Sequence, residues 1–519
     1  MKRDFAALQG EFDLLVCGGG IYGAWTAYDA ALRGLKVALV EQADWASGTS
    51  SASSKLIHGG LRYLETYDFK LVRKALKERQ LLLDIAPHRV WPLRFGVAVY
   101  DASRNGRMLL KAGLILYDAL AGFPGESMRH HYLNSQEFSS RFPFLQKAGL
   151  RGGFTYSDAQ TDDVRLVLEL VAGAMAQGAV CVNYAKLVDW QEEDGKVCGA
   201  EVQDVSTGDK QKVRARQCVS TSGRWAQQNW QGRAWCRLSK GVHLVLPALP
   251  AQEAVLLTAK KDGRVFFIIP WYGRTLLGTT DTDYRGQVDQ VQVEESDIDY
   301  LLDAANAYLR QAWGRQDVIG SYAGVRVMKQ SNAADPSAAS RDWELKTSAN
   351  GLHHAIGGKL TSAREDAAVI VDAVCARLGV NTACASKGRA LPWVPQRDFT
   401  VWVSESAASA GGLGIDDESA QWLMRRHGAR ISDVFEIVRE NPQYAARIVP
   451  ELPFIHADLL LCARDEMAVH LVDLLRRRMP LLILARLDAA RLRHLAELLS
   501  PVLSWDAQRV TGEVQACLA

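Results

Sequence analysis

A glycine turn near the start of the chain constrains its fold more than any other sequence feature. The apolar run 12–17 is typical of a strand buried on both faces of a parallel sheet. The sequence then predicts a helix over 22–32 and a second strand over 35–40. Between the first strand and the helix lie three glycines that allow a sharp bend, a close approach to a diphosphate and tight helix packing: Gly18, Gly20 and Gly23.

An acidic residue completes this pattern. Glu41 ends the second strand, 23 residues after Gly18, where a carboxylate can bind the two hydroxyls of a ribose. A glycine-rich turn without a ligand would leave this acid unexplained. The order of strand, turn, helix, strand and acid therefore predicts a dinucleotide site.

The length and composition indicate a folded chain of several domains. At 519 residues, the chain exceeds the size of a single core, and 48% hydrophobic and 23% charged residues are ordinary for a globular protein. A net charge of +2 and basic clusters without aromatic neighbours argue against nucleic-acid binding. Nine scattered cysteines without a C-x-x-C pair favour a reducing compartment, and they predict neither disulfides nor a metal site.

The sequence predicts no membrane-spanning helix, but one segment could lie on a membrane surface. The start of the chain, 1–12, is too polar for a signal peptide. The segment 108–120 is largely apolar and too short to cross a bilayer. It could lie in the interface plane, with Arg104, Arg107 and Lys111 toward the lipid headgroups. A buried core helix is the alternative.

Small residues and further glycine turns recur along the chain. The hydroxyl-rich loop 47–54 suits a diphosphate or the edge of a ring, and 222–225 and 357–361 are glycine turns that precede helices. The last of these would place backbone amides at a helix N-terminus, where a phosphate or a carbonyl oxygen is favoured. Beyond a linker at 392–395 the composition becomes helical, and its run 476–478, Arg-Arg-Arg, is interpreted as a solvated helix end.

Several short motifs occur in an informative order: Gly18–Gly23, Ser50–Glu65, Tyr156–Asp158, Lys240–His243, Pro270-Trp271, Gly278–Asp281, Gly324–Arg326, Arg341-Asp342 and Gly357–Thr361. Together they resemble the FAD-dependent glycerol-3-phosphate dehydrogenases, which are respiratory enzymes that reduce quinones. The resemblance covers residues from about 12 to 380 and, more loosely, the helical C-terminal part. The run 50–65 is the most specific match.

The resemblance implies an α/β fold with three parts. These are a Rossmann-like FAD-binding domain of the D-amino-acid-oxidase/glutathione-reductase type, an inserted mixed-sheet substrate domain and a C-terminal helical domain. The expected FAD-binding domain is discontinuous, over 1–90, 151–240 and 346–390. The substrate domain would take 91–150 and 241–345, and the helical domain 396–519.

The resemblance also implies an activity, the oxidation of sn-glycerol 3-phosphate to dihydroxyacetone phosphate. Hydride would pass from C2 to N5 of FAD, and the electrons would pass to ubiquinone or another membrane quinone. Such an enzyme would act in glycerol metabolism and the respiratory chain. It would bind peripherally to the cytoplasmic face of the inner membrane, be otherwise cytoplasmic, and could form a homodimer.

Two other functions stay open. The first is an oxidase on the same fold, which would reduce oxygen while oxidising a related hydroxy acid, amine or glycerol phosphate. The second is a non-catalytic flavin- or lipid-binding protein whose C-terminal helices recruit a partner.

The chemistry of the implied substrate points to cationic residues. A phosphate monoester carries close to two negative charges, and planar guanidinium groups bind its oxygens bidentately. By resemblance, Arg326 and Arg341 would bind the phosphate. The same matched motifs imply that Arg62, Tyr63 and Lys359 complete the pocket.

Oxidation of a secondary alcohol also needs a proton acceptor. The hydroxyl proton must leave with the hydride, so a group of near-neutral pKa is expected beside C2. His58 and His243 are the candidates, and the sequence does not choose between them. Arg326 is expected to act with them in catalysis.

The matched motifs also imply a set of FAD-binding residues, drawn from the glycine turns and the hydroxyl-rich loop: Gly18, Gly20, Gly23, Glu41, Thr49, Ser50, Ser54, Leu56, His58, Gly223, Gly358, Lys359, Leu360 and Thr361.

Four positions depart from the family's pattern. Trp25 replaces a small residue, Arg224 and Val327 replace prolines, and Ala363 replaces a tyrosine. These substitutions concern the turns near the flavin and the path to the electron acceptor. None removes a predicted phosphate ligand.

Overall fold

The computed structural model describes residues 1–518 except 66, 102, 104–105, 227–228, 231–232 and 330–342. Of β11 (Asn229–Trp230) and β12 (Arg233–Ala234) only the backbone is described. Arg104, predicted to face lipid headgroups, and Arg341, predicted to bind the substrate phosphate, lie outside the described residues.

The first sheet contains the glycine turn. Its central strands β20, β10, β1, β2 and β7 run parallel, with β10 and β2 on either side of β1. Because β1 is paired on both edges and covered on both faces, its side chains are almost all buried, as the apolar run predicted. The described strands of this sheet are β1 (Glu11–Cys17), β2 (Val37–Val40), β7 (Val180–Val182), β8 (Ala185–Glu193), β9 (Lys196–Asp204), β10 (Lys210–Ser220), β19 (Glu344–Thr347) and β20 (His353–Ile356).

The second sheet is mixed. Its strands pair antiparallel, except that β14 and β4 run parallel. The described strands are β3 (Leu56–Ile57), β4 (Val90–Tyr100), β5 (His131–Leu133), β6 (Leu150–Thr161), β13 (Cys236–Pro247), β14 (Ala254–Thr258), β15 (Val265–Trp271), β16 (Arg274–Gly278), β17 (Thr282–Asp283) and β18 (Gly320–Lys329).

Strands β3 and β6 fall within ranges that the sequence assigned to the FAD-binding domain, yet both pair into the second sheet. Gly153 of β6 allows close packing, because a Cβ there would lie 2.3 Å from the ring of Phe138. The domain ranges themselves stay a prediction.

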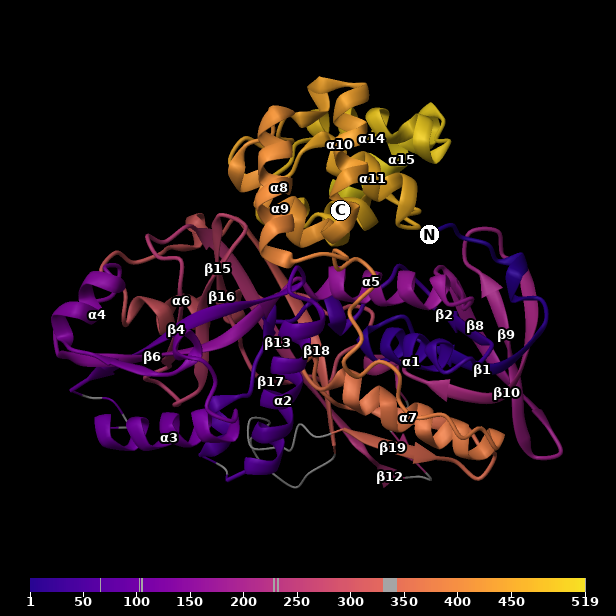
Figure 1. The fold of residues 1–519 in the computed structure, drawn as a ribbon, viewed down its shortest axis with the longest axis horizontal. Coiled ribbons are helices and arrows are strands. Elements are labelled where there is room, and N and C mark those ends of the chain that lie inside the picture. Colours follow the sequence, from indigo (N-terminus) through magenta and orange to yellow (C-terminus); the bar gives the residue numbers. More distant parts are fainter. Residues whose placement is uncertain are drawn as a thin grey trace.

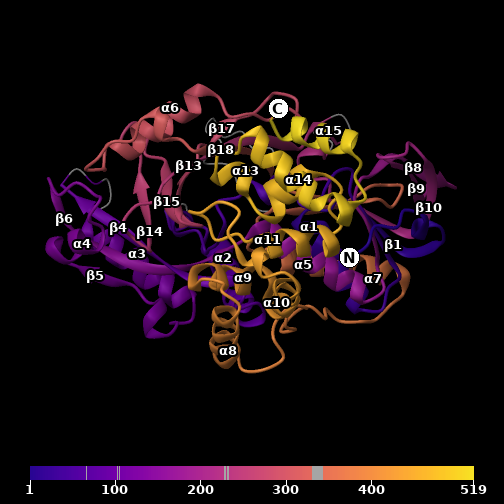
Figure 2. The same cartoon turned by 90° about the horizontal axis from the view of Figure 1, so that it is seen from above.

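Helices cover the sheets and form a layer above them (Figure 1). On the first sheet, α1 packs against α5 and α7. The C-terminal helices, orange to yellow, lie over the junction of the two sheets when viewed from above (Figure 2). The described helices are α1 (Ile21–Leu32), α2 (Phe69–Ile85), α3 (Arg107–Leu120), α4 (Ser135–Arg141), α5 (Asp163–Ala176), α6 (Glu295–Asn306), α7 (Ala363–Leu378), α8 (Phe399–Gly412), α9 (Asp417–His427), α10 (Ile431–Glu440), α11 (His456–Asp465), α12 (Leu471–Asp473), α13 (Leu481–Leu484), α14 (Ala489–Leu503) and α15 (Ala507–Leu518).

Buried ion pairs join the C-terminal helices to the first sheet. Arg478 is fully buried and donates to both carboxylate oxygens of Asp44, at 2.5 and 2.9 Å. Arg477 donates to the same carboxylate at 2.5 Å. The interpretation of these two arginines as a solvated helix end was therefore wrong. Their partner lies 434 residues before Arg478 in the chain, so no local pattern could indicate it.

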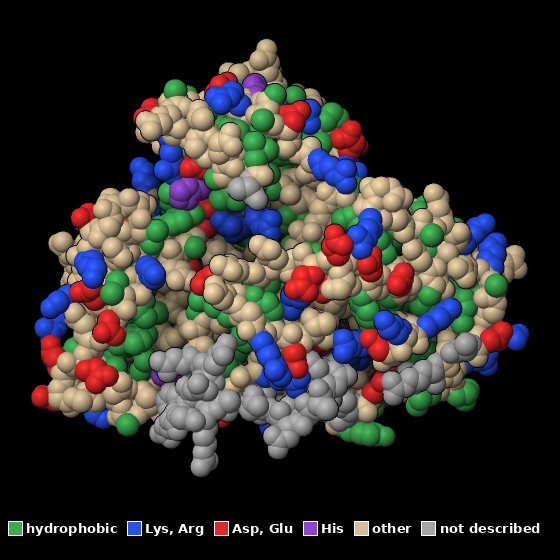
Figure 3. Space-filling view, turned by 180° about the vertical axis from the view of Figure 1, so that it is seen from behind, with side chains coloured by type: hydrophobic (Ala, Val, Ile, Leu, Met, Phe, Trp, Pro, Cys, Tyr) green, Lys and Arg blue, Asp and Glu red, His purple; other side chains and the backbone are tan. Residues whose placement is uncertain are grey.

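The helix α3 has one buried face and one exposed face. Leu114 and Tyr117 are buried, whereas Met108 is 73% exposed and Leu109 is 64% exposed. One face of α3 is therefore part of the core, whereas contact of the exposed face with a membrane stays a prediction. Among the described residues, no helix combines the length and apolar character needed to cross a bilayer. Acidic and basic side chains are mixed over the back of the molecule (Figure 3).

Candidate active site

A cavity of about 840 Å³ opens where the carboxyl ends of four parallel strands meet the second sheet. Residues that follow β1, β2, β10 and β20 line it, together with residues of the second sheet. This edge of a parallel sheet is where ligands of α/β folds bind. The volume lies in the upper part of the range of roughly 300–1,000 Å³ usual for ligand pockets.

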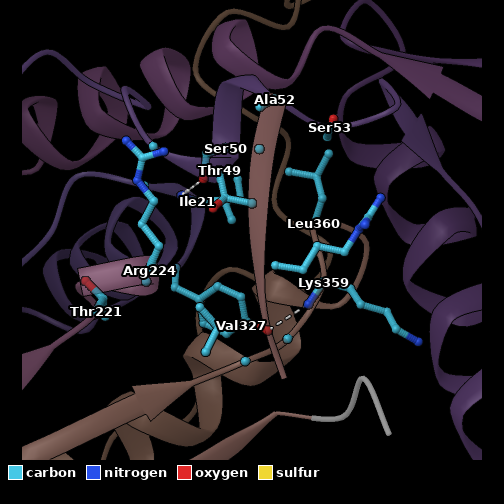
Figure 4. Close-up of a pocket in the computed structure, with 18 of the residues that line it drawn as sticks. Ile21, Thr49, Ser50, Ala52, Ser53, Thr221, Arg224, Val327, Lys359 and Leu360 are labelled. Atoms are coloured by element: carbon cyan, nitrogen blue, oxygen red, sulfur yellow. Dashed lines mark hydrogen bonds between the residues drawn. The ribbon is translucent and has the colours of Figure 1, made fainter. Parts of the chain in front are cut away.

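The cavity brings together most of the residues that the sequence singled out. Of the predicted cofactor residues only Gly23 does not line it, and every described substrate or catalytic candidate does. These lining residues are Gly18, Gly20, Glu41, Thr49, Ser50, Ser54, Leu56, His58, Arg62, Tyr63, Gly223, His243, Arg326, Gly358, Lys359, Leu360 and Thr361. Several of them are drawn in Figure 4.

The glycine turn leaves no room for side chains. A Cβ on Gly18, whose φ is +114°, would lie 2.6 Å from the backbone oxygen of Thr221. A Cβ on Gly23 would lie 1.8 Å from the backbone oxygen of Gly18. The α1 helix begins at Ile21, after its N-cap Gly20, and both residues line the cavity. The positive end of the helix dipole therefore lies at the cavity, where an anion is favoured.

Two side chains hold the backbone of this turn. Ser50 Oγ accepts a hydrogen bond from the Ile21 amide at 2.9 Å (Figure 4). The carboxylate of Glu41 accepts from the Gly19 amide at 2.6 Å and from the Ala43 amide at 3.0 Å. Burial raises the pKa of Glu41, and the two amides oppose that rise. Glu41 thus lines the cavity at the end of β2, where the sequence placed a ribose-binding acid.

The hydroxyl-rich loop is bonded to the second sheet. Thr49 Oγ1 donates to the backbone oxygen of Val325 at 2.6 Å. Ser54 Oγ lies 2.8 Å from His243 Nε2. The loop therefore bridges the two sheets along one wall of the cavity.

The turn at 357–361 lies against α1. The phenol of Tyr22 accepts a hydrogen bond from the Lys359 amide at 3.2 Å and donates to Asp366 at 2.5 Å. A Cβ on Gly358, whose φ is +98°, would lie 1.7 Å from the Tyr22 oxygen. Sequence reasoning missed Tyr22, because nothing in the α1 sequence indicates a partner 337 residues away.

The two candidate histidines differ in exposure. His243 is 1% exposed and stacks on Tyr322, with ring centroids 4.9 Å apart. Its Nδ1 atom is buried without a hydrogen-bond partner among the described residues. Burial, helped by Arg326 and Lys55, holds the pKa of His243 well below its usual value. His58 is only partly buried and lies edge-on to Phe267, at 6.4 Å between centroids.

The cationic side chains predicted to bind substrate contact two different sets of residues. Arg326 donates from Nη2 to Thr279 Oγ1 at 2.8 Å, and its Nη1 lies 3.6 Å from Asp281. The Lys359 ammonium lies 4.0 Å from the ring centroid of Tyr63, and the guanidinium of Arg62 lies 5.6 Å from the same centroid. Tyr63 therefore joins two of these cations at the cavity wall.

A further buried cation was missed by the sequence reasoning. Lys55 lies inside the most specific motif, yet no role was assigned to it. Its ammonium donates to Asp163 at 2.7 and 2.9 Å and to the backbone oxygen of Ser51 at 2.7 Å. It fixes the loop before β3 against the start of α5. The sequence did offer one signal for this role, because Lys55 directly follows the run of small residues 47–54.

These features fit FAD. The glycines would clash with their surroundings if they carried a Cβ, so the turn offers backbone alone to a ligand. The acid at the end of β2 suits a ribose, and the helix N-terminus suits a diphosphate. The turn at 357–361 and the loop 47–58 line the rest of the same cavity, where a flavin ring would lie.

Comparisons with known proteins agree with this reading. Residues 13–364 match the family described as FAD dependent oxidoreductase, and residues 397–510 match the C-terminal domain of alpha-glycerophosphate oxidase. The chain is 35% identical to the glycerol-3-phosphate dehydrogenase of Synechocystis sp., over 99% of this chain and 97% of that protein. It is 34% identical to the aerobic glycerol-3-phosphate dehydrogenase of Staphylococcus epidermidis, over 90% and 86% of the two chains.

One solved structure is similar over nearly the whole chain. The FAD complex of glycerol-3-phosphate dehydrogenase from Bacillus halodurans has a TM-score of 0.78 and 29% sequence identity. The match covers 98% of this chain and 94% of that one. The two chains therefore share the FAD-binding fold, the mixed sheet and the C-terminal helices.

Proposed function

The chain belongs to the FAD-dependent glycerol-3-phosphate dehydrogenase family, and from that premise we propose that it oxidises sn-glycerol 3-phosphate to dihydroxyacetone phosphate. The observation that carries this proposal is one cavity that holds the cofactor cradle, two histidines and the cations Arg62, Arg326 and Lys359.

The phosphate would bind among these cations. Arg326 supplies a planar guanidinium, which suits phosphate oxygens, and Gly241 leaves room for it: a Cβ there would lie 2.4 Å from its Nη2. Lys359 and Arg62 both lie near the ring of Tyr63. They would supply the remaining positive charge that neutralises the phosphate dianion. Arg341 is proposed as a further ligand on the resemblance alone.

Bound FAD would supply the two-electron acceptor that takes the hydride from C2 at N5. The chain must then take the hydroxyl proton. We propose His58 for this role because its partly exposed ring lies in the cavity. In His243, Nε2 is hydrogen-bonded to Ser54 Oγ and Nδ1 is buried. We therefore propose that His243 positions Ser54 and its loop beside the flavin.

Electrons would then pass to a membrane quinone. Exposed apolar side chains on α3 and in the turns near it support this step: Tyr67, Met108, Leu109, Ile115 and Phe123. The helix α3 packs on η3 (Leu61–Leu64), the turn that carries Arg62 and Tyr63. Its Tyr117 hydroxyl also accepts from the Gly59 amide at 3.0 Å. A membrane-bound surface would therefore lie beside the catalytic cavity, on the cytoplasmic face of the inner membrane.

The membrane contact is tested by sedimentation with anionic vesicles. The double variant Met108→Asp/Leu109→Asp should lose vesicle binding, because two charges replace apolar contacts. Val401→Asp is the matched control, because Val401 is a 50% exposed apolar residue of α8. Equal binding by both variants would contradict the assignment of α3.

The acceptor is tested by turnover assays with glycerol 3-phosphate. A quinone-reducing dehydrogenase should turn over faster with a short-chain ubiquinone than with oxygen, with little peroxide formed. An oxidase is the second candidate, because the C-terminal residues match a domain named after alpha-glycerophosphate oxidase. One equivalent of peroxide per turnover, without stimulation by quinone, would favour the oxidase.

A further inference from the structure

Arg224 lies on the cofactor side of the cavity. It belongs to η5 (Gly223–Trp225), the short turn after β10. The same strand end contacts the glycine turn, because Thr221 Oγ1 donates to the backbone oxygen of Gly18 at 2.9 Å. In Figure 4 the side chain of Arg224 extends from this turn toward Thr49, Ser50 and the start of α1.

The other cations of the cavity lie in different surroundings. Among the described lining residues the lysines and arginines are Arg62, Arg224, Arg264, Arg326 and Lys359. Arg264 donates to the backbone oxygen of Asp281, beside the contacts of Arg326, whereas Arg62 and Lys359 lie at Tyr63. Arg264 and Arg326 therefore lie beside Asp281, and Arg62 and Lys359 lie beside Tyr63. Arg224 belongs to neither group.

No ion pair joins Arg224 to an acid among the described residues. Of the nearby carboxylates, Asp289 accepts a hydrogen bond from the Trp225 indole N–H at 2.6 Å. Glu41 accepts hydrogen bonds from two backbone amides. The Nε atom of Arg224 is buried without a hydrogen-bond partner among the described residues. Burial lowers the pKa of Arg224, with Asp289, Tyr284 and Glu41 opposing. The guanidinium is partly buried and lies 4.3 Å from the ring centroid of Trp225. An approaching anion would stabilise a partly desolvated cation of this kind.

We propose that Arg224 binds the diphosphate of FAD. The diphosphate is the anion that the glycine turn and the α1 N-terminus are built to receive, and a guanidinium beside them would donate to its oxygens. The proposal rests on FAD as the cofactor and not on the identity of the substrate.

The test compares nucleotides that differ only in the diphosphate. Apoprotein is titrated with FAD, ADP and adenosine, with Arg224→Gln, Arg224→Lys and Arg224→Pro as variants. Loss of one charge-assisted contact should raise the Kd of FAD and ADP by about 10- to 100-fold in the glutamine and proline variants. The Kd of adenosine should stay within about twofold of wild type, and lysine should restore part of the ADP affinity.

A matched control is Arg216→Gln, because Arg216 is an exposed residue of the same strand β10. It should leave all three Kd values unchanged. Unchanged FAD and ADP affinity in Arg224→Gln and Arg224→Pro would overturn the proposal. A loss for adenosine as large as that for ADP would also overturn it, since the contact would then not be to the diphosphate.

Discussion

Replacing Asp44 with asparagine probes the link between the C-terminal helices and the cofactor loop. Asp44 is fully buried and lies three residues after Glu41, in a loop whose Trp45 packs on the glycine turn: a Cβ on Gly19 would lie 2.5 Å from that indole. Its carboxylate receives hydrogen bonds from Arg477 and Arg478. The asparagine is nearly the same size but carries no charge.

The expected loss of stability follows from the burial of this ion pair. Burial alone would raise the pKa of Asp44, but Arg478 and Arg477 outweigh it and lower the pKa from 3.8 to about 2. That shift corresponds to roughly 2.5 kcal/mol of preference for the charged form. Removing one partner of a buried pair costs about 3–5 kcal/mol. We therefore expect Asp44→Asn to lower the free energy of unfolding by about 3 kcal/mol.

This loss is measured by unfolding the holoprotein in urea. The unfolding is followed by flavin fluorescence and by far-UV circular dichroism. The matched control is Asp101→Asn, because Asp101 pairs with Arg151 at an exposed site, where the side chains are 54% and 71% exposed. That pair should contribute no more than about 1 kcal/mol. Because the loop carries Glu41, the flavin signal of Asp44→Asn should change at lower urea than the circular dichroism. Equal midpoints for Asp44→Asn and Asp101→Asn would refute this reasoning.

The remaining predictions concern the catalytic cavity. Arg326→Ala should raise KM for glycerol 3-phosphate by about 30-fold, equivalent to about 2 kcal/mol, and an unchanged KM would contradict its role at the phosphate. His58→Asn should lower kcat by about 10²- to 10⁴-fold, whereas His243→Asn should keep most of it; the reverse order would exchange their roles. Because burial holds the pKa of His243 below 6.5, this ring stays neutral above that pH. Any loss of kcat/KM on acidification through pH 6.5–8 should therefore persist in His243→Asn, and its disappearance would contradict the assignment. Gly23→Ala should weaken FAD retention because its Cβ would lie 1.8 Å from the Gly18 oxygen, whereas Gly113→Ala, with open space around it, should not.

Local features could be predicted from the sequence. The glycine turn, its helix and Glu41 lie within one short segment, so spacing alone indicated their arrangement. The resemblance then pointed to residues in distant segments, and the described ones other than Gly23 line a single cavity. Whether each of them binds FAD or substrate stays a prediction.

Contacts between distant segments could not be predicted. The phenol of Tyr22 meets Lys359 across 337 residues, and Arg478 meets Asp44 across 434. Neither contact leaves a periodic or compositional trace, because one hydrogen bond constrains one residue and not its neighbours. Arg224 was visible in the sequence as a departure from the family. The burial of its Nε atom without a hydrogen-bond partner among the described residues needed the structure.

Anaerobic titration of the oxidised flavoprotein with sn-glycerol 3-phosphate tests the central claim most directly. The account predicts that about one equivalent of substrate per flavin bleaches the visible absorption and yields dihydroxyacetone phosphate, and that added quinone restores the oxidised spectrum. A flavin that dithionite reduces but glycerol 3-phosphate leaves oxidised would contradict it.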